Sequence, residues 1–187
     1  MRSSDTSVLL VLDATAFYAG IPFLGSSRRR RCYTTADVFD EVKHIKRSHQ
    51  AIEALIDAGN LVIEEPGASY LRQAKELARK SGDIPKMSRA DLSVIALALR
   101  FGASGTKVSI VTDDNAIANV AGMSGIRVSP VMGSGIRKVG RWIRYCSGCG
   151  RSYSSTQKIC SVCGNRLRMR LRGGRTTTTT KTKAAKR

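Results

Sequence analysis

Over the first 129 residues, the chain alternates between short apolar runs and longer stretches of helical periodicity. The apolar runs are rich in β-branched residues, as buried strands are, and cover residues 8–12, 61–63 and 108–111, with an edge strand at 126–128. The helical patterns include one with Val38, Phe39, Val42 and Ile45 on a single face, and others at residues 48–58, 69–80, 88–101 and 115–123. Strands that alternate with helices predict a parallel sheet in an α/β sandwich.

The pattern changes after residue 129. Residues 130–141 contain three glycines and no long apolar pattern, which predicts a linker. Residues 142–171 hold paired cysteines, and residues 172–187 hold a run of five threonines among Lys and Arg, a composition typical of disorder. We therefore predict an α/β domain at 1–129, a linker at 130–141, a small module at 142–171 and a disordered basic tail at 172–187.

Charge divides the chain at nearly the same place. The formal net charge is +18, from 32 Lys and Arg against 14 Asp and Glu. Every acid lies at or before Asp114, whereas all residues from 136 onward contribute fifteen basic groups and no acid. A domain with nearly equal numbers of acidic and basic groups, followed by a basic appendage, predicts a polyanionic partner. Nucleic acid is the first expectation.

Apolar stretches are too short to suggest a membrane partner. Residues 8–12 form the only continuous apolar run near the N-terminus, and Asp13 interrupts it. No stretch approaches the roughly 20 apolar residues of a membrane span. The expectation is a cytoplasmic protein whose thiols stay reduced, so that its five cysteines are metal ligands rather than disulfides.

Four cysteines form two Cys-x-x-Cys pairs, each followed by a glycine: Cys146 and Cys149, then Cys160 and Cys163. Two intervening residues let a tight turn aim both sulfurs at one ion, and glycine relieves that turn. Four thiolates suit one structural Zn²⁺ and leave no position for a catalytic water. Disulfides, a redox pair or an iron site are the alternatives. Cys32 has no partner at ligand spacing and is interpreted as an ordinary thiol.

Acidic residues follow two predicted strands and lie on two predicted helices: Asp13, Asp113, Asp91 and Glu41. The carboxyl ends of parallel strands share one edge of a sheet, so Asp13 and Asp113 are expected to converge there. Crowded carboxylates repel, and a bound Mg²⁺ or Mn²⁺ compensates and activates water for attack on a phosphodiester. Helix capping explains Asp13, Asp91 and Asp113 equally well, and Glu41 fits an exposed charge. From spacing alone, both interpretations stay open.

Several segments together resemble the PIN-domain nucleases: Leu-Asp-Ala-Thr-Ala-Phe at 12–17, Tyr-Thr-Thr at 33–35, Asp-Val-Phe-Asp-Glu-Val at 37–42, Ser-Arg-Ala-Asp-Leu at 88–92 and Val-Thr-Asp-Asp at 111–114. More specifically, Gly-Asp-Ile-Pro at 82–85, the stretch from Thr112 to Val120, and Trp-Ile-Arg-Tyr-Cys-Ser-Gly-Cys at 142–149 resemble the Nin-one-binding family. The resemblance extends to about Arg170. The short chain lacks the long insertions of eukaryotic members, which favours an archaeal form, and the Thr-rich tail departs from the pattern.

The resemblance implies a PIN-like parallel sheet sandwiched by helices, followed by a zinc ribbon. It implies that Asp13, Glu41, Asp91 and Asp113 bind the catalytic Mg²⁺ or Mn²⁺ and that the four paired cysteines bind Zn²⁺. The implied activity is a metal-dependent endoribonuclease cleaving precursor small-subunit (16S-type) rRNA at its 3′ end, in the nascent small ribosomal subunit, with other assembly factors as further partners. Asp114 is interpreted as a cap or a supporting residue.

Two other functions stay open beside this one. A non-catalytic RNA-binding assembly factor would carry a degenerate site, whereas this chain has all four acids. A toxin-like PIN ribonuclease acting on tRNA or mRNA would not need the ribbon.

Basic residues gather in two places outside the tail. The loop run Arg28, Arg29, Arg30 and Arg31 is interpreted either as a phosphate-binding element beside the acids or as a solvated loop. Arg166, Arg168, Arg170 and Arg172 alternate, so a strand would present them on one face toward RNA. Trp142, Tyr145 and Tyr153 either stack on unpaired bases or cover the core of the ribbon.

Overall fold

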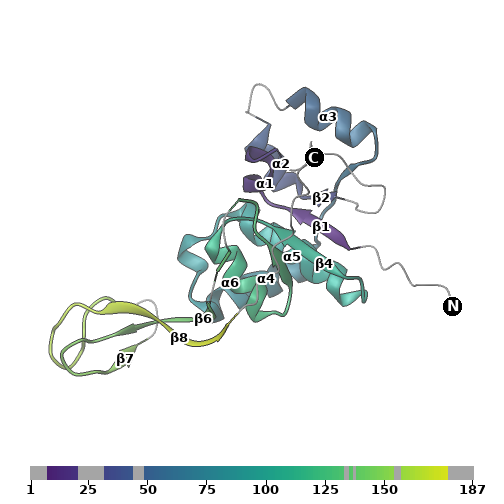
Figure 1. The fold of residues 1–187 in the computed structure, drawn as a ribbon. Coiled ribbons are helices and arrows are strands. Elements are labelled where there is room, and N and C mark those ends of the chain that lie inside the picture. The colour runs from purple at the N-terminus through teal and green to yellow at the C-terminus, as the bar shows by residue number, and fades with distance from the viewer. Residues whose placement is uncertain are drawn as a thin grey trace.

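The computed structural model describes residues 8–20, 32–43, 49–132, 135–136, 138–153 and 157–176, and it contains two sheets in separate parts of the chain (Figure 1). The strands of the first sheet are β1 (Leu9–Leu12), β2 (Cys32–Thr34), β3 (Leu61–Ile63), β4 (Val108–Val111) and β5 (Arg127–Ser129). They are all parallel, in the order β3-β2-β1-β4-β5. The strands of the second sheet are β6 (Lys138–Tyr145), β7 (Ser152–Tyr153) and β8 (Arg168–Thr176), antiparallel in the order β7-β6-β8.

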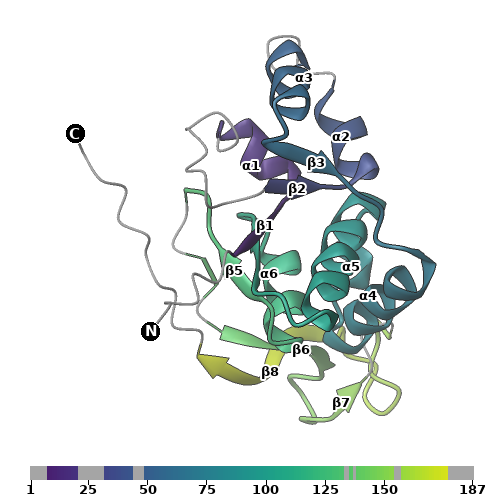
Figure 2. The same cartoon turned by 90° about the vertical axis from the view of Figure 1, so that its right-hand side faces the viewer.

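Helices flank the parallel sheet, as the alternating pattern predicts. They are α1 (Ala14–Tyr18), α2 (Ala36–Val42), α3 (His49–Asp57), α4 (Ala68–Ser81), the 3-10 turn η2 (Ile84–Lys86), α5 (Arg89–Ala103) and α6 (Asn115–Met123). Helices α4 and α5 pack side by side on one side of the strands (Figure 2). The predicted α/β class is therefore confirmed. Within the described ranges, no helix is both long and apolar enough to cross a membrane.

The core lies between the central strands and α5. Strands β1 and β4 contribute Val11, Leu12 and Ile110, all fully buried, and α5 presents Ile95 and Leu97 to the same core. The helix begins with a capping box, in which the Ser88 hydroxyl accepts from the Asp91 N–H and the Asp91 carboxylate accepts from the Ser88 N–H. This box fixes the helix start, and with it the position of Asp91.

Strand β2 is an element that the sequence analysis did not predict. It pairs with β1 through Leu10 opposite Cys32 and Val11 opposite Tyr33, and the Tyr33 ring packs edge-on against Phe101 at 4.8 Å. A three-residue segment is too short to show a period of its own, so the strand arises from pairing with its neighbour. Ile45 and the run Arg28 to Arg31 lie outside the described residues, as does everything after 176.

The second sheet begins and ends differently from the predicted boundaries. Strand β6 starts at Lys138, inside the segment predicted as a linker, and β8 continues to Thr176, inside the segment predicted as a disordered tail. Gly140 lies against the backbone of Gly173, and a side chain on Gly140 would collide with it. Gly173 itself has a φ of 63° at the irregularity in the pairing. Gly140 and Gly173 serve close strand pairing, in segments that the sequence analysis assigned to a linker and to a disordered tail.

Candidate metal centres

The carboxyl ends of β1 and β4 bring the first group of candidate residues together. The two strands are direct neighbours, with Leu12 opposite Val111. Asp13 follows β1, and the segment Thr112-Asp113-Asp114 follows β4. These residues therefore meet at one edge of the sheet, where ligands of open α/β folds bind.

Asp13 is 3% exposed and is held by two threonine hydroxyls. Thr112 donates to Oδ2 of Asp13 at 2.7 Å, and Thr15 donates to the same oxygen at 2.9 Å. The two hydroxyl oxygens in turn accept the backbone N–H groups of Asp114 and Asp113. Both threonines thus link the loop after β4 to Asp13, and among the described residues Oδ1 is left for a further ligand. Sequence reasoning did not single out Thr15 or Thr112, although the Thr-Asp-Asp segment was noted.

A second hydrogen bond brings α2 and α5 together. Thr35 caps the start of α2 by accepting the N–H of Val38, and its hydroxyl lies 2.6 Å from that of Ser93 on α5. Both hydroxyls are buried. This contact fixes Glu41, on α2, relative to Asp91, in the first turn of α5.

Electrostatic coupling shows which acids share a site. The pKa of Glu41 is raised by partial desolvation and then by repulsion from Asp91, Asp13 and Asp37. The pKa of Asp91 is also raised, first by desolvation and further by repulsion from Asp13 and Asp114, while the hydrogen bonds from Ser88 oppose the shift. Asp13, Glu41 and Asp91, all named from the sequence, therefore lie close enough to repel one another.

The adjacent acids Asp113 and Asp114 are engaged differently. The carboxylate of Asp113 accepts the backbone N–H groups of Val131 and Met132, at 2.9 and 3.0 Å. The Asp114 carboxylate caps α6, accepting from the N–H of Ala116 at 2.6 Å, and it is Asp114 that repels Asp91. The cap suggested for either residue thus belongs to Asp114.

The donor set fits a divalent cation. Carboxylate oxygens are the ligands that Mg²⁺ and Mn²⁺ prefer, and the mutual repulsion that raises the pKa of Glu41 and Asp91 is the condition that a bound cation relieves. The acids of this part of the chain are therefore of the chemical type that holds a divalent metal ion.

The four paired cysteines form a second candidate centre. The ligand atoms of Cys146, Cys149, Cys160 and Cys163 all lie within 4.8 Å of one another. Gly150 and Gly164, with φ of 73° and 70°, close two matching turns by donating to the carbonyls of Cys146 and Cys160. The predicted role of the glycines is confirmed, and the cluster fits a tetrahedral ion bound entirely by thiolates.

Tyr153 supports this cluster from the side. Its hydroxyl lies 2.9 Å from Sγ of Cys160, and this hydrogen bond is the main cause that lowers the pKa of Cys160 to about 5. A thiolate is the form that binds metal. Tyr153 also packs against the small core formed by Cys146, Cys160 and Leu167. Of the two interpretations of this tyrosine, the structure favours covering the ribbon core.

The arginines predicted to form a stripe lie along β8. The register sets Arg168 opposite Tyr145, Arg170 opposite Ile143 and Arg172 opposite Arg141, so the three share one face of the sheet. All three are exposed, and the Arg170 guanidinium lies 4.7 Å from the centre of the Tyr145 ring. Arg166 is exposed but precedes the strand, in an isolated bridge with Ile159. We call Arg141, Arg168, Arg170 and Arg172 the arginine stripe.

Comparisons with known proteins show which family the chain resembles. Residues 10–101 match the family model described as PIN domain of ribonuclease. The Endoribonuclease Nob1 of Pyrococcus abyssi is 36% identical over 162 residues, which cover 86% of this chain and 92% of that protein. The Endoribonuclease Nob1 of Methanothermobacter thermautotrophicus is 35% identical over 159 residues, covering 84% and 90%. Matches of this length must extend into the cysteine-bearing sheet.

A shorter match is to a ribonuclease of another name. The Ribonuclease VapC3 of Aeropyrum pernix is 34% identical over 119 residues, which cover 64% of this chain and 83% of that protein.

Proposed function

The chain belongs to the Nob1 family of endoribonucleases, and we propose that it cleaves precursor small-subunit rRNA at its 3′ end in a reaction that depends on Mg²⁺ or Mn²⁺. The observation that carries the proposal is the group of mutually repelling carboxylates that come from the ends of β1 and β4 and from α2 and α5. A non-catalytic RNA-binding factor would have no need to maintain such a costly arrangement.

We assign the metal-binding carboxylates to Asp13, Glu41, Asp91 and Asp114. The assignment of Asp114 differs from the sequence-based one, which named Asp113. Its support is that Asp114 repels Asp91, whereas the Asp113 carboxylate accepts two N–H groups of the segment at 131–132. Asp113 then anchors that segment beside the site.

Each residue near the metal has a separate task. A cation bound by the carboxylates supplies activated water and neutralises charge on the phosphodiester. Thr15 and Thr112 hold Oδ2 of Asp13, so that its second oxygen stays oriented. The Thr35 contact with Ser93 holds the helices that carry Glu41 and Asp91 at a fixed separation.

In this proposal the second sheet binds zinc and contacts the RNA. The four cysteines hold one Zn²⁺, which stabilises a module whose own core is very small. The arginine stripe contacts phosphates of the RNA, and those contacts position the substrate without reading its sequence. The nascent small subunit in the cytoplasm is the proposed place of action, with other assembly factors as further partners.

Mapping of the cut tests the substrate assignment. The full chain is incubated with an RNA that spans the 3′ end of small-subunit rRNA, with and without added Mn²⁺ or Mg²⁺. An RNA of the same length from the interior of the rRNA is the matched control. We expect one metal-dependent cut at the mature 3′ end and none in the control. Equal, scattered cleavage of both RNAs would contradict the rRNA assignment while leaving ribonuclease activity intact.

A further inference from the structure

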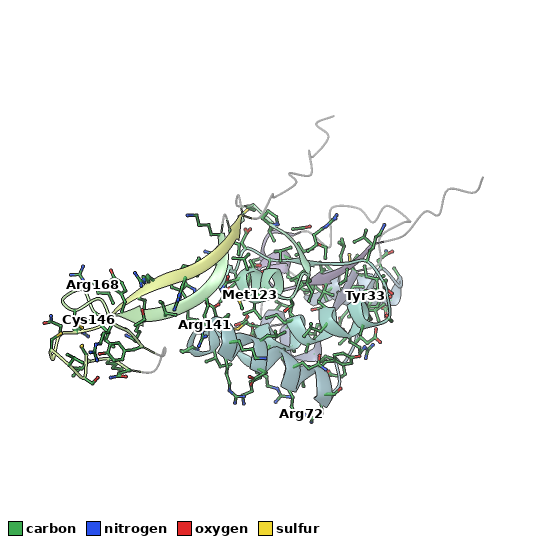
Figure 3. The ribbon with its side chains drawn as sticks, turned by 90° about the horizontal axis from the view of Figure 1, so that it is seen from below. Tyr33, Arg72, Met123, Arg141, Cys146 and Arg168 are labelled. Carbon is green, nitrogen blue, oxygen red and sulfur yellow. The ribbon has the colours of Figure 1, made fainter. Side chains whose placement is uncertain are left out.

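A cleft of about 530 Å³ lies where β6 meets the nuclease domain. Its lining includes Asp113 and Asp114 beside the acidic site, and Lys86, Lys138 and Trp142 from η2 and β6. Figure 3 shows the second sheet extending from this junction, close to the labelled Arg141 and Met123. The volume lies within the range of ordinary ligand sites. The cleft thus adjoins the acidic site through Asp114 and also carries an indole and two ammonium groups.

Trp142 lies outside the two hydrophobic cores of the described residues, and it is only half-buried. The register pairs it with Leu171, so it lies on the face of β6 opposite the arginine stripe. The ammonium of Lys86 lies 4.9 Å from the centre of its ring. Of the two interpretations left open by the sequence, the structure gives no support for covering of the ribbon core by Trp142.

The nuclease domain holds this part of β6 rigidly. The Asn119 side chain accepts the Gly140 N–H at 2.8 Å, donates to the Gly140 carbonyl at 2.9 Å, and donates to the buried carboxylate of Asp83 at 2.6 Å. Gly82 allows the close approach of Trp142, because a side chain there would lie 2.8 Å from the Trp142 carbonyl oxygen. The backbone that carries the indole is thus held against the nuclease domain at Asn119 and Gly82.

An aromatic face with nearby ammonium groups is the combination that recognises single-stranded nucleic acid. A base stacks on the ring, and the cations bind the adjoining phosphate. The carboxylates of Asp113 and Asp114 repel a phosphate because both carry negative charge. A phosphate next to the cleaved one is therefore expected on the side of the cleft that carries the lysines. Duplex RNA, whose bases are already stacked, cannot use the indole in this way.

We propose that this cleft binds an unpaired nucleotide of the substrate next to the cleaved phosphodiester, with the base on Trp142 and a phosphate between Lys86 and Lys138. The proposal rests on the proposed function, because it takes RNA as the substrate and the acids as the site of cleavage. Under this proposal the junction between the two modules is part of the substrate site. Strand β6 then helps to determine which phosphodiester is cleaved.

Trp142 is the only tryptophan of the chain, so its fluorescence reports on this cleft alone. Full-length, zinc-loaded Asp13→Asn protein is titrated with an unstructured single-stranded RNA oligonucleotide, and total binding is followed in parallel by fluorescence anisotropy of labelled RNA. We expect the tryptophan emission to change and to saturate together with the anisotropy. A duplex of the same sequence should bind with little change in emission.

Variants separate this cleft from general charge attraction. Lys86→Ala should weaken single-strand binding several-fold, and Trp142→Ala by about tenfold, whereas Trp142→Phe should retain most of the affinity. Lys75→Ala, which removes the same charge from an exposed position on α4, is the matched control and should bind like the parent protein.

Three results would overturn the proposal: unchanged tryptophan emission at saturating RNA, an equal response to duplex, or equal affinities of Lys86→Ala and Lys75→Ala. Because the titration uses no cleavage, its outcome is separate from that of the proposed function. Cleavage at the rRNA 3′ end without a fluorescence response would reject the nucleotide site alone. A specific response in a wild-type protein that cleaves no RNA would support the site and reject the proposed reaction.

Discussion

At the scale of single residues, the adjacent acids Asp113 and Asp114 have different environments that their spacing could not reveal. Both follow β4, and from the sequence Asp113 is a candidate ligand or cap, whereas Asp114 is interpreted as a cap or a supporting residue. The folded chain aims one carboxylate at the N–H groups of residues 131 and 132, and places the other where it caps α6 and repels Asp91. Sequence identified the acidic segment, but the direction of each side chain depends on long-range contacts.

Substitution of the two residues by Asn tests the difference. Asp114→Asn should keep the cap, since Asn and Asp cap helices about equally well, so the free energy of unfolding should change by less than about 0.5 kcal/mol. Cleavage should be lost because a charged ligand is gone. Asp113→Asn should loosen the segment at 131–132, because the two N–H groups bind different carboxylate oxygens and an amide offers only one oxygen, while cleavage falls less.

Thermal melting and cleavage of the two variants, measured side by side, give the answer. Full cleavage by Asp114→Asn together with inactive Asp113→Asn would restore the assignment made from the sequence.

The raised pKa values of Glu41 and Asp91 predict a pH dependence of the metal-free protein. A carboxyl with a raised pKa keeps its proton in the folded state after the unfolded chain has lost it. Stability is therefore lost as pH rises from the ordinary carboxyl range through the raised pKa values. Added Mn²⁺ should cancel this loss and release protons on binding.

Melting temperature against pH, with and without Mn²⁺, checks the sign. Asp13→Asn should flatten the metal-free profile, because it removes a charge that repels both acids. Metal-free stability that rises over the same pH window would contradict the proposed crowding.

At the scale of elements, local patterns predicted most helices and strands, and they failed where pairing or packing creates the element. The bounds of β3, β4 and α6 agree with the predicted ranges because each has a clear apolar pattern. Strand β2 and the start of β6 have no such pattern. The first depends on β1, and the second depends on Asn119 and Gly140, whose meeting cannot be inferred from their separation in sequence.

The contact of Asn119 with β6 yields a prediction at this scale. Asn119→Ala removes the partners of the Gly140 backbone and of the buried Asp83 carboxylate, so unfolding should become easier by about 2 to 3 kcal/mol. Hydrogen exchange at the Gly140 amide should accelerate more than exchange in β1. If hydrogen exchange at the Gly140 amide were unchanged, contacts other than those of Asn119 would hold β6 in place.

At the scale of the whole molecule, the two modules depend on different forces. The nuclease domain has an extensive apolar core, whereas the ribbon core consists of two cysteines and Leu167, with Tyr153 packed against it. Removal of zinc by a chelator should therefore unfold the ribbon and leave the nuclease domain folded. Metal analysis and amide NMR spectra before and after chelation measure this. Reduced, well-folded protein with substoichiometric zinc would contradict the prediction.

The arginine stripe should govern how salt weakens RNA binding. Replacing Arg168, Arg170 and Arg172 with Gln should lower the slope of log affinity against log salt by about 0.7 for each lost phosphate contact with single-stranded RNA. A control triple of Arg72, Lys75 and Lys80 to Gln removes equal charge from α4; Arg72 lies well away from Arg168 (Figure 3). Equal slopes for the two triple variants would mean that the stripe makes no special contribution.

The measurement that tests the account most directly is cleavage of the rRNA 3′-end substrate by Asp13→Asn protein over a range of Mn²⁺ concentrations. Asn keeps an oxygen that can accept from both Thr15 and Thr112, so folding and RNA binding should be retained. Loss of the charged ligand should reduce cleavage by more than about 100-fold, beyond what loss of a supporting residue causes. Cleavage at the wild-type rate by this folded, RNA-binding variant would contradict the proposed metal site.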